Sequence, residues 1–401
     1  MKVSLEDIKK AKQVIAPVIK HTPVDISVSA SKLLSSEVFF KYENQQMTGS
    51  FKIRGAYNKI SNLSAEEKSR GVVASSAGNH AQGVAFSATK QNVKSTIVMP
   101  KTAPLIKIAA TKDYGADVVL AGEIYDEAYE HARLLEKEKG YVFVHPFEDP
   151  HVIAGQGTIG LEIIEELKDL ESIVIPIGGG GLISGIATAV KALNPKCKIF
   201  GVQSEATPGM EKLFHKQSYQ EPKKRVSTIA DGIAVKRPSQ IMYDNFISKL
   251  VDEIVTVSDD EIAEAIVFLM ERNKTVAEGS GAAGMAAAMN GKLKLGKKTC
   301  ILLGGGNIDL NMIAKVIEQG LTRKGRLVEL SVVVDDLPGN LNRLTAAIAD
   351  LRANILQVHH DRVFKGLHLR ETRINFLLET TSQEHVEQIR TALLNAGARV
   401  S

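Results

Sequence analysis

Short apolar runs alternate with helix-like segments between residues 35 and 320, and this alternation narrows the choice of fold more than any other feature. The runs are continuous, which is typical of strands that are covered on both faces. Helical patterns separate them, for example at residues 80–90, 126–137 and 260–272. Alternating strand and helix units predict an α/β fold with mostly parallel sheets. The strand candidates are residues 95–99, 117–120, 172–175, 198–202 and 299–303.

The pattern changes after residue 320. Residues 321–326 include three basic side chains and predict a linker. Strand-like and helix-like segments then follow in the order βαββαβ, which is typical of a ferredoxin-like module. We therefore expect a large α/β domain over residues 1–320 and a small domain over 327–401. The elements expected in the small domain are a strand at 327–334, a helix from the turn at 335–340 to about 352, strands at 355–363 and 371–378, a helix at 383–395 and a short strand at 398–400.

Composition and charge exclude several classes of partner. Of the 401 residues, 44% are hydrophobic and 24% are charged, as in an ordinary globular protein. A net charge of +4 gives no electrostatic case for binding nucleic acid or a membrane surface. No stretch approaches ~18 uninterrupted apolar residues, and the N-terminal segment lacks an apolar signal core, so we expect a cytoplasmic protein. Cys197 and Cys300 lack metal-ligand spacing and are expected to be buried free thiols.

Four consecutive glycines follow an apolar segment and precede a helix-like pattern at 182–192; they are Gly178, Gly179, Gly180 and Gly181. Glycines let the backbone approach a ligand closely, and the start of a helix presents N–H groups to an anion. This arrangement predicts a phosphate cradle, and the alternative is a tight strand-to-helix turn. A dinucleotide fingerprint would need a glycine in the place of Ser184, so the run argues against a nicotinamide site.

A second turn of this kind follows the apolar residues 72–74. It consists of Ser76, Ala77, Gly78, Asn79 and His80. A helix that begins near Asn79 would also offer N–H groups to an anion, and a substrate carboxylate suits this place. Two alternatives stay open, because Ser76 and Asn79 are also good helix caps and His80 can be a structural histidine.

One lysine, Lys52, lies where a polar turn leads into a helix-like pattern. Most lysines in such positions are simply solvated. Further along the chain, however, a second glycine run at residues 304–306 ends in Asn307. A reactive lysine together with a phosphate cradle is what a pyridoxal phosphate enzyme requires. The combination, rather than either part, predicts an enzyme.

Four motifs, in chain order, resemble those of the threonine/serine dehydratases, which belong to the tryptophan-synthase-β-like class of pyridoxal phosphate enzymes. They are SFKIRGA at 50–56, SAGNHAQG at 76–83, GGGGL at 178–182 and GGNID at 305–309. His145-Pro146 and residues 153–158 also match, so the resemblance extends from about residue 5 to residue 320. It implies a two-lobed fold in which a small lobe, residues 41–150, is inserted into a large one.

The resemblance also implies a role for each matching residue. Lys52 would hold the cofactor as a Schiff base and, once the substrate amine has freed it, would remove the Cα proton. Asn79 would bind the ring hydroxyl and Phe51 would pack near the ring, with Gly304 beside the pyridine nitrogen. The substrate carboxylate would lie on the turn formed by Ser76, Ala77, Gly78, Asn79 and His80. The cofactor phosphate would lie on Gly178, Gly179, Gly180, Gly181 and Leu182.

The implied reaction is the dehydration and deamination of L-threonine to 2-oxobutanoate and ammonia, with L-serine giving pyruvate. Two residues depart from the family pattern. Related serine racemases have a serine that acts as a second acid/base in the place of Ala77, so we expect elimination with little racemisation. Many relatives have serine or cysteine in the place of Gly304, and water, a neighbour such as Ser280 or the bare pocket would have to replace it. Some relatives hold a cation, for which Glu205 and Glu211 are candidate ligands.

Residues 336–341, at a strand-to-helix turn, resemble part of an ACT regulatory domain. Such domains bind amino acids at their mutual interfaces, so the resemblance implies a homo-oligomer, dimer or tetramer, and an allosteric effector, with isoleucine or valine as the hypothesis. A biosynthetic role, in making isoleucine, and a catabolic role stay open.

Other interpretations of the whole chain are a serine racemase or serine dehydratase, a cysteine synthase and a non-catalytic amino-acid sensor. The sequence around Lys52 argues against the synthase, and the intact Lys52 and Asn79 argue against the sensor.

Overall fold

The computed structural model describes residues 1–222, 226–362 and 368–400, and the chain divides between Ile308 and Asp309 into two units. This division precedes the boundary that we expect at residue 320. Helix α15 (Leu310–Arg323) also enters the expected linker 321–326, because apolar residues continue at helical spacing through Val316 and Ile317. The limits of the two expected functional domains stay a prediction.

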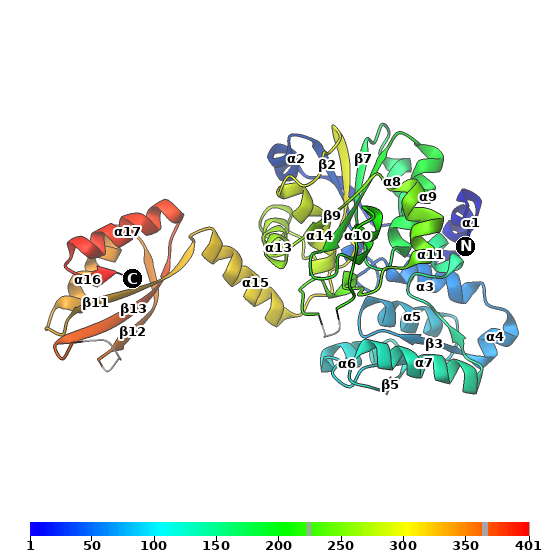
Figure 1. Cartoon of the computed structure of the whole chain (residues 1–401), viewed down its shortest axis with the longest axis horizontal. Coiled ribbons are helices and arrows are strands. Elements are labelled where there is room, and N and C mark those ends of the chain that lie inside the picture. Colours follow the sequence, from blue (N-terminus) through cyan, green and yellow to red (C-terminus); the bar gives the residue numbers. More distant parts are fainter. Residues whose placement is uncertain (223–225, 363–367, 401) are drawn as a thin grey trace. The chain divides into compact units, whose positions relative to one another are not determined.

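A six-stranded sheet forms the centre of the larger lobe of the first unit (Figure 1). Every neighbouring pair of strands is parallel except the first pair, which is antiparallel. The expected strands at 172–175 and 198–202 lie within this sheet, and the expected strand at 299–303 is present except for its last residue. In spatial order the strands are β1 (Val24–Ile26), β2 (Glu37–Lys41), β10 (Lys298–Leu302), β7 (Ser172–Pro176), β8 (Lys198–Ser204) and β9 (Glu253–Val257).

The smaller lobe contains a second sheet, in which all neighbouring strands are parallel. Its strands, in spatial order, are β5 (Asp117–Leu120), β4 (Ser95–Met99), β3 (Val72–Ser75) and β6 (Val142–Phe143). The first two have the expected bounds. The two sheets together confirm the expected α/β class. Ligands of such sheets bind beyond the carboxyl ends of the strands, and β3 ends there at the turn 76–80.

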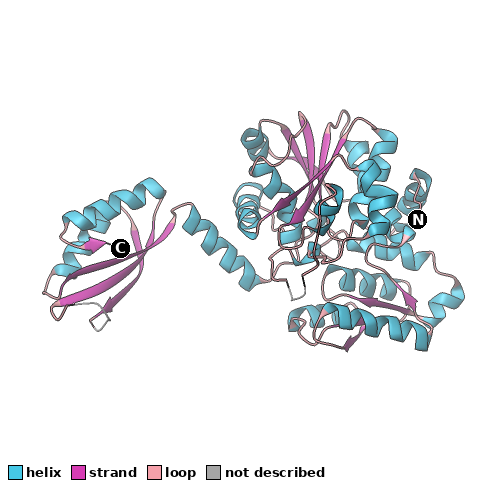
Figure 2. Ribbon diagram, in the orientation of Figure 1, coloured by secondary structure: helices cyan, strands magenta, loops and turns pink. Residues whose placement is uncertain are grey.

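Helices cover both faces of the six-stranded sheet (Figure 1; Figure 2). Helices α13 (Asp259–Asn273) and α14 (Gly279–Met289) lie on one side, and α8 (Pro150–Glu166) and α9 (Gly181–Leu193) lie on the other. The largest apolar core joins α8 and α9 to strands β7 and β8. Helix α1 (Leu5–Ile15) packs on α8 and begins at a capping box formed by Ser4 and Asp7.

Both cysteines are buried and free, as expected. Within the described ranges, no helix has the length and apolar character needed to cross a membrane. The remaining elements of the first unit are α2 (Val28–Leu34), η1 (Glu43–Gln45), α3 (Lys52–Ser61), α4 (Ala65–Arg70), α5 (Asn79–Lys90), α6 (Leu105–Asp113), α7 (Tyr125–Lys139), α10 (Gly209–Phe214), η2 (Asp231–Ile233), α11 (Gln240–Met242), η3 (Tyr243–Ile247) and α12 (Ser248–Leu250).

After α15, the second unit follows the expected βαββαβ order. Its antiparallel sheet buries one face against two helices, with Leu330, Phe376, Leu344 and Ile389 at the centre of the core. The expected end of one strand, Val363, lies outside the described residues. The elements are β11 (Leu327–Asp335), α16 (Asn340–Asp350), β12 (Asn354–Asp361), β13 (Glu371–Glu379), α17 (Gln383–Asn395) and β14 (Arg399–Val400), with the sheet order β12-β13-β11-β14.

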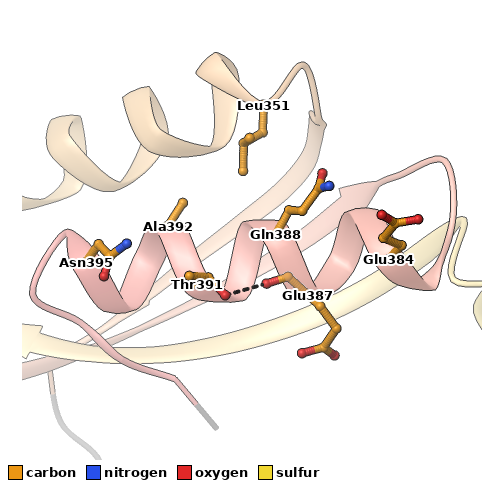
Figure 3. Close-up of a pocket in the computed structure, with 7 residues that line it drawn as sticks. All are labelled: Leu351, Glu384, Glu387, Gln388, Thr391, Ala392 and Asn395. Carbon is orange, nitrogen blue, oxygen red and sulfur yellow. Dashed lines mark hydrogen bonds between the residues drawn. The ribbon is translucent and has the colours of Figure 1, made fainter.

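A surface groove of about 460 Å³ lies in the second unit, between Leu351 and one side of α17 (Figure 3). Leu351 follows α16 and points toward α17, while the carboxylates of Glu384 and Glu387 lie along the helix. The groove is therefore a feature of the helical layer rather than of the sheet. Its other lining residues are Gln388, Thr391, Ala392 and Asn395.

Candidate active site

Lys52 is the first residue of α3, and the turn before it is held against the segment that follows β10. The N–H of Phe51 donates to Gly304 O at 3.1 Å, and Ser50 forms a β-bridge with Gly305. The fold therefore brings together the lysine and the second glycine run, which the sequence separates widely.

Two glycines hold the first turn of α3 in place by letting neighbouring backbones touch it. A Cβ atom on Gly83, in α5, would lie 3.2 Å from the carbonyl carbon of Lys52. A Cβ atom on Gly155, in α8, would lie 2.6 Å from Arg54 O. Because α3 contacts both helices at backbone distance, the position of Lys52 is set by the fold around it.

The Lys52 side chain is partly buried and makes one hydrogen bond within the described part of the chain, from Nζ to Pro146 O at 3.4 Å. Nζ also lies 5.2 Å from the centre of the Phe51 ring. Burial lowers the pKa of Lys52 from 10.5 to about 8, although the negative charge of Glu278 acts in the opposite direction. An amine with this pKa keeps a useful neutral fraction near pH 7, and the neutral form is the one that attacks a carbonyl.

Arg54, two residues further along α3, differs from Lys52 because carboxylates surround its charged group. Its guanidinium group is fully buried and donates to both oxygens of Glu43 at 2.8 Å and to both oxygens of Glu162 at 2.6 and 2.9 Å. Lys41 is also fully buried and donates to Glu162 Oε2 at 2.5 Å and to Thr22 O at 2.7 Å. We call Lys41, Glu43, Arg54 and Glu162 the buried ion cluster. It ties α3 to β2 and α8.

The first glycine run is a tight turn in which other protein atoms occupy the space that side chains would need. A Cβ atom on Gly179 would lie 2.3 Å from the Phe147 ring, and one on Gly181 would lie 2.8 Å from Phe147 Cβ. Gly180 has a φ of +98°, which favours glycine, and a Cβ atom on Gly178 would lie 3.1 Å from Ile233 Cα. Helix α9 then begins without a side-chain cap. A ligand at this turn would therefore meet backbone N–H groups of the first helical turn, which includes Leu182.

The second predicted turn also leads into a helix without a side-chain cap. Helix α5 begins at Asn79, and a Cβ atom on Gly78 would meet no atom of the described residues within 4 Å. Ser76 Oγ accepts from the N–H of Gly78 at 3.2 Å, and the Asn79 amide donates to Glu278, so neither side chain caps α5. This start of α5, with the partly buried Ala77 in the turn, has both the N–H groups and the open space that an anion needs.

Two histidines lie within electrostatic reach of Lys52, and both are neutral at pH 7. His80 Nε2 lies 2.8 Å from Val144 O and must carry the proton, because a carbonyl oxygen only accepts. His145 Nδ1 accepts from the N–H of Glu148 at 2.7 Å. Burial lowers the pKa of His80 to about 3 and that of His145 to about 4. These contacts favour the structural interpretation of the His80 side chain.

Glu278 is a buried acid at the site that sequence reasoning missed. Its Oε1 accepts from Asn79 Nδ2 at 2.8 Å and from Ser280 Oγ at 2.5 Å, and burial raises its pKa. Asn307, in the motif at 305–309, donates from its Nδ2 to Asn79 Oδ1 at 2.8 Å, a contact that the motif does not predict. The one sequence signal for Glu278 is a lone charge among small apolar residues, where charged side chains are uncommon.

Gly304 has space beside it for a small side chain. A Cβ atom there would lie 3.5 Å from the Phe51 ring and 3.7 Å from Pro176, which are ordinary contact distances. Ser280 was one candidate to replace the missing side chain, but its hydroxyl donates to Glu278. Ser280 is therefore engaged elsewhere.

The two candidate cation ligands are both in contact with basic side chains. Glu205 is exposed and lies 3.5 Å from Lys292, and Glu211 lies 3.4 Å from Lys212 and 3.9 Å from His215. In the ranges that the structure describes, no group of three His, Cys, Asp or Glu side chains could hold a metal ion. A bound cation stays a prediction.

The match to a protein-family model decides which family this fold and site belong to. Residues 15–305 match the model described as pyridoxal-phosphate dependent enzyme. The chain belongs to this family. The matched segment includes Lys52, both uncapped helix starts and the first two glycines of the second run, so the cofactor is pyridoxal 5′-phosphate.

Curated relatives within this pyridoxal-phosphate dependent family differ in length. L-threonine ammonia-lyase of Thermotoga maritima is 49% identical over 398 residues, which cover 99% of each chain. The catabolic L-threonine dehydratase TdcB of Escherichia coli K12 is 46% identical over 317 residues, which are 78% of this chain but 96% of that protein. The match therefore covers nearly all of the second relative but leaves about a fifth of this chain unmatched.

Solved structures in the family include both lyases and racemases. The processed form of threonine deaminase isoform 2 from Solanum lycopersicum is 38% identical with a TM-score of 0.73, and the match covers 79% of this chain and 86% of that one. Maize serine racemase is 33% identical with a TM-score of 0.74, and the match covers 80% and 99% of the two chains. The fold alone therefore does not separate elimination from racemisation.

The residues of the site fit pyridoxal phosphate. The cofactor needs an amine for its aldehyde, and Lys52 supplies one with a lowered pKa. It needs donors for a phosphate, and the uncapped start of α9 supplies N–H groups. The buried hydroxyls of Ser50 and Ser75, beside the lysine turn and at the end of β3, also have no hydrogen-bond partner within the described ranges. The site thus has unused polar groups where a polar cofactor would lie.

Proposed function

We propose that this chain is a threonine ammonia-lyase, which dehydrates and deaminates L-threonine to 2-oxobutanoate and ammonia and also converts L-serine to pyruvate. The observation that carries the proposal is the state of Lys52. Its side chain is partly buried, and its amine has a lowered pKa and, among the described residues, a single long hydrogen bond; it lies beside two helix starts that suit anions. The full-length similarity to a protein named L-threonine ammonia-lyase supports the choice of reaction.

The geometry suggests how the residues of the chain divide the work. Pyridoxal phosphate, when bound, supplies an electron sink for the charge that develops at Cα. Lys52 would anchor it and, once freed by the substrate amine, would take the Cα proton, for which a neutral amine is needed. The N–H groups at the start of α9 would hold the phosphate, and those of the Ser76–His80 turn would hold the substrate carboxylate. Phe51 and Asn79 would contact the ring.

Racemisation is the competing activity, and the residue at position 77 argues against it. Moving a proton to the opposite face of Cα requires a second group that can give one, and the methyl side chain of Ala77 cannot. We therefore expect the enzyme to stop at elimination. Substitution of Ala77 by serine would supply a hydroxyl at this place.

A keto-acid assay with L-threonine and L-serine side by side tests the proposal. We expect 2-oxobutanoate and pyruvate from the purified protein, together with a visible absorbance band of the lysine-bound cofactor. Lys52→Ala should remove the band and lower activity by roughly 10⁴-fold or more, because it removes both the anchor and the base. Absence of keto acid from both substrates would reject the proposal, and D-serine formation at the rate of pyruvate formation would favour the racemase.

We also propose that the second unit is an ACT domain that senses an amino acid. Two observations support this, namely its βαββαβ order and a catabolic L-threonine dehydratase of which 96% is matched by only 78% of this chain. A regulatory addition to a complete catalytic unit would have this distribution. Isoleucine is the first effector to test and valine the second, and a response to isoleucine would point to a biosynthetic role.

The regulatory proposal is tested by titrating isoleucine and valine against activity. The full chain and a chain that ends before residue 327 should have similar activity without effector, and only the full chain should respond. An equal response from both would reject the tail as the sensor. Sedimentation of the full chain and the shortened chain would show whether the proposed homo-oligomer, dimer or tetramer, depends on the same unit.

A further inference from the structure

Glu278 is placed at the start of a helix but does not serve that helix. It precedes α14 as the N-cap residue, and its carboxylate makes no capping hydrogen bond to that helix. Its backbone N–H donates to Gly305 O at 3.0 Å, which fixes the residue against the second glycine run. The side chain instead accepts from Asn79 and Ser280 with the same oxygen, Oε1. Glu278 is thus committed to the Asn79 amide, which comes from the other lobe.

The orientation of the Asn79 amide follows from a chain of hydrogen bonds with only one consistent assignment. Asn307 Nδ2 lies 2.8 Å from Thr48 O, and a carbonyl oxygen only accepts, so this atom of Asn307 is the donor. The same Nδ2 donates to Asn79 Oδ1 at 2.8 Å. The oxygen of Asn79 therefore faces Asn307, and its NH₂ group faces Glu278. One N–H of Asn79 is left without a partner within the described ranges.

We propose that Glu278 is a positioning residue that acts through Asn79. It holds one N–H of the Asn79 amide while Asn307 holds the amide oxygen, so that the second N–H is fixed in the direction of the cofactor ring oxygen. We call Asn307, Asn79 and Glu278 the amide relay. The inference rests on the proposed function, in which Asn79 contacts the cofactor.

The surroundings of the amide relay support a fixed arrangement. A Cβ atom on Gly305 would lie 2.6 Å from Glu278 Oε1 and 3.2 Å from Asn79 Nδ2, so only glycine leaves room for this contact. Gly49 has a φ of +70°, and a Cβ atom there would lie 2.2 Å from Asn307 Oδ1. Burial raises the pKa of Glu278, but a carboxyl oxygen accepts hydrogen bonds in either protonation state. Glu278 can therefore accept the hydrogen bond from Asn79 whether or not its carboxyl group is charged.

A double-mutant cycle on cofactor affinity tests whether Glu278 acts through Asn79. The measurement is the dissociation constant of pyridoxal phosphate from the cofactor-free full chain, by calorimetry or fluorescence quenching. Asn79→Ala and Glu278→Met should each weaken binding by about tenfold, the effect of one buried hydrogen bond, and the double variant should be no weaker than Asn79→Ala alone. Glu278→Gln keeps an acceptor oxygen for both donors and should stay within about threefold of the parent protein.

Asp252→Asn is the matched control. Asp252 lies in the same lobe as Glu278 and, like Glu278, accepts from two donors, which are Lys191 and the N–H of Ile199. It should leave cofactor affinity unchanged. If Glu278→Met does not fold, Asn307→Ala replaces it, since it removes the other restraint on the same amide, and it should likewise add nothing to Asn79→Ala.

The amide relay is rejected if the effects of Glu278 and Asn79 multiply, if Glu278→Met leaves affinity unchanged, or if Asp252→Asn weakens binding as strongly. The keto-acid assay on the unmodified chain separates this result from the reaction itself. Tight cofactor binding without keto acid would reject the proposed activity and leave the relay standing.

Discussion

Lys52 and Arg54 are two basic residues on one turn of α3 that the protein treats in opposite ways. Arg54 is paired with two carboxylates, one of which also accepts from Lys41, and every charged group of the buried ion cluster makes hydrogen bonds within it. Within the part of the chain that the structure describes, Lys52 has one long hydrogen bond to a backbone carbonyl and no carboxylate in contact. Neutralised charge deep in a core fixes geometry, whereas a cation left without a partner is easily converted to a neutral nucleophile. The contrast separates the residue that positions the helix from the residue that reacts.

The largest expected effect comes from breaking the buried ion cluster. Arg54→Met would leave Glu43 and Glu162 buried with too little positive charge, and it should lower the free energy of unfolding by about 3–5 kcal/mol. Urea unfolding of the cofactor-free protein measures this. The control is Lys12→Met, which removes an exposed pair with Glu165 and should cost no more than about 1 kcal/mol. Equal losses of unfolding free energy in the two variants would mean that the buried ion cluster stabilises the fold no more than an exposed ion pair does.

The next effect is on the reactivity of Lys52. Amine-directed reagents react only with the neutral form, so the rate of labelling of Lys52 in the cofactor-free protein should rise with a midpoint near pH 8. Peptide mapping after labelling at a series of pH values gives the midpoint. A midpoint at the ordinary lysine value of 10.5 would show that the site does not activate its amine.

The smallest of the three effects is a gain in stability from removing Lys52. Its pKa is lower in the folded protein than in the unfolded chain, so burial of the ammonium group opposes folding below about pH 8, and this cost disappears above 10.5. Lys52→Met should therefore stabilise the cofactor-free protein at pH 7 by about 1–2 kcal/mol, a figure reduced for the partial exposure of the side chain. Thermal unfolding at pH 7 and pH 10.5 tests this, and a gain that does not shrink at the higher pH would contradict it.

Local patterns predicted most of the fold, because short apolar runs and helical spacing report burial directly. The bounds of β4 and β5 and the expected elements of the second unit follow from such patterns. The sequence also indicated the turn at Gly178–Gly181 and the helix start at Lys52, because turns depend on neighbouring residues.

The same local patterns could not predict contacts between residues that are far apart in the sequence. Glu278 meets Asn79 across 199 positions, and the carboxylates that surround Arg54 come from two other elements. Phe147 fills the space beside Gly179 and Gly181, although nothing in its own segment predicts that contact. Such residues become visible only when the fold brings their partners together, since the spacing of residues along the chain carries no information about them.

The pairing of β2 with β10 has a consequence for how the chain is made. Lys41 pairs in register with Leu302, so the centre of the larger sheet stays open until nearly the whole first unit has left the ribosome. At 5–20 residues per second, the interval of about 260 residues takes roughly 13–50 s. During that time the apolar strand that contains Val38 and Phe40 has no neighbour on one edge. Synthesis of this protein should therefore depend on chaperones that shield an N-terminal strand, and slow translation should increase aggregation of the nascent chain.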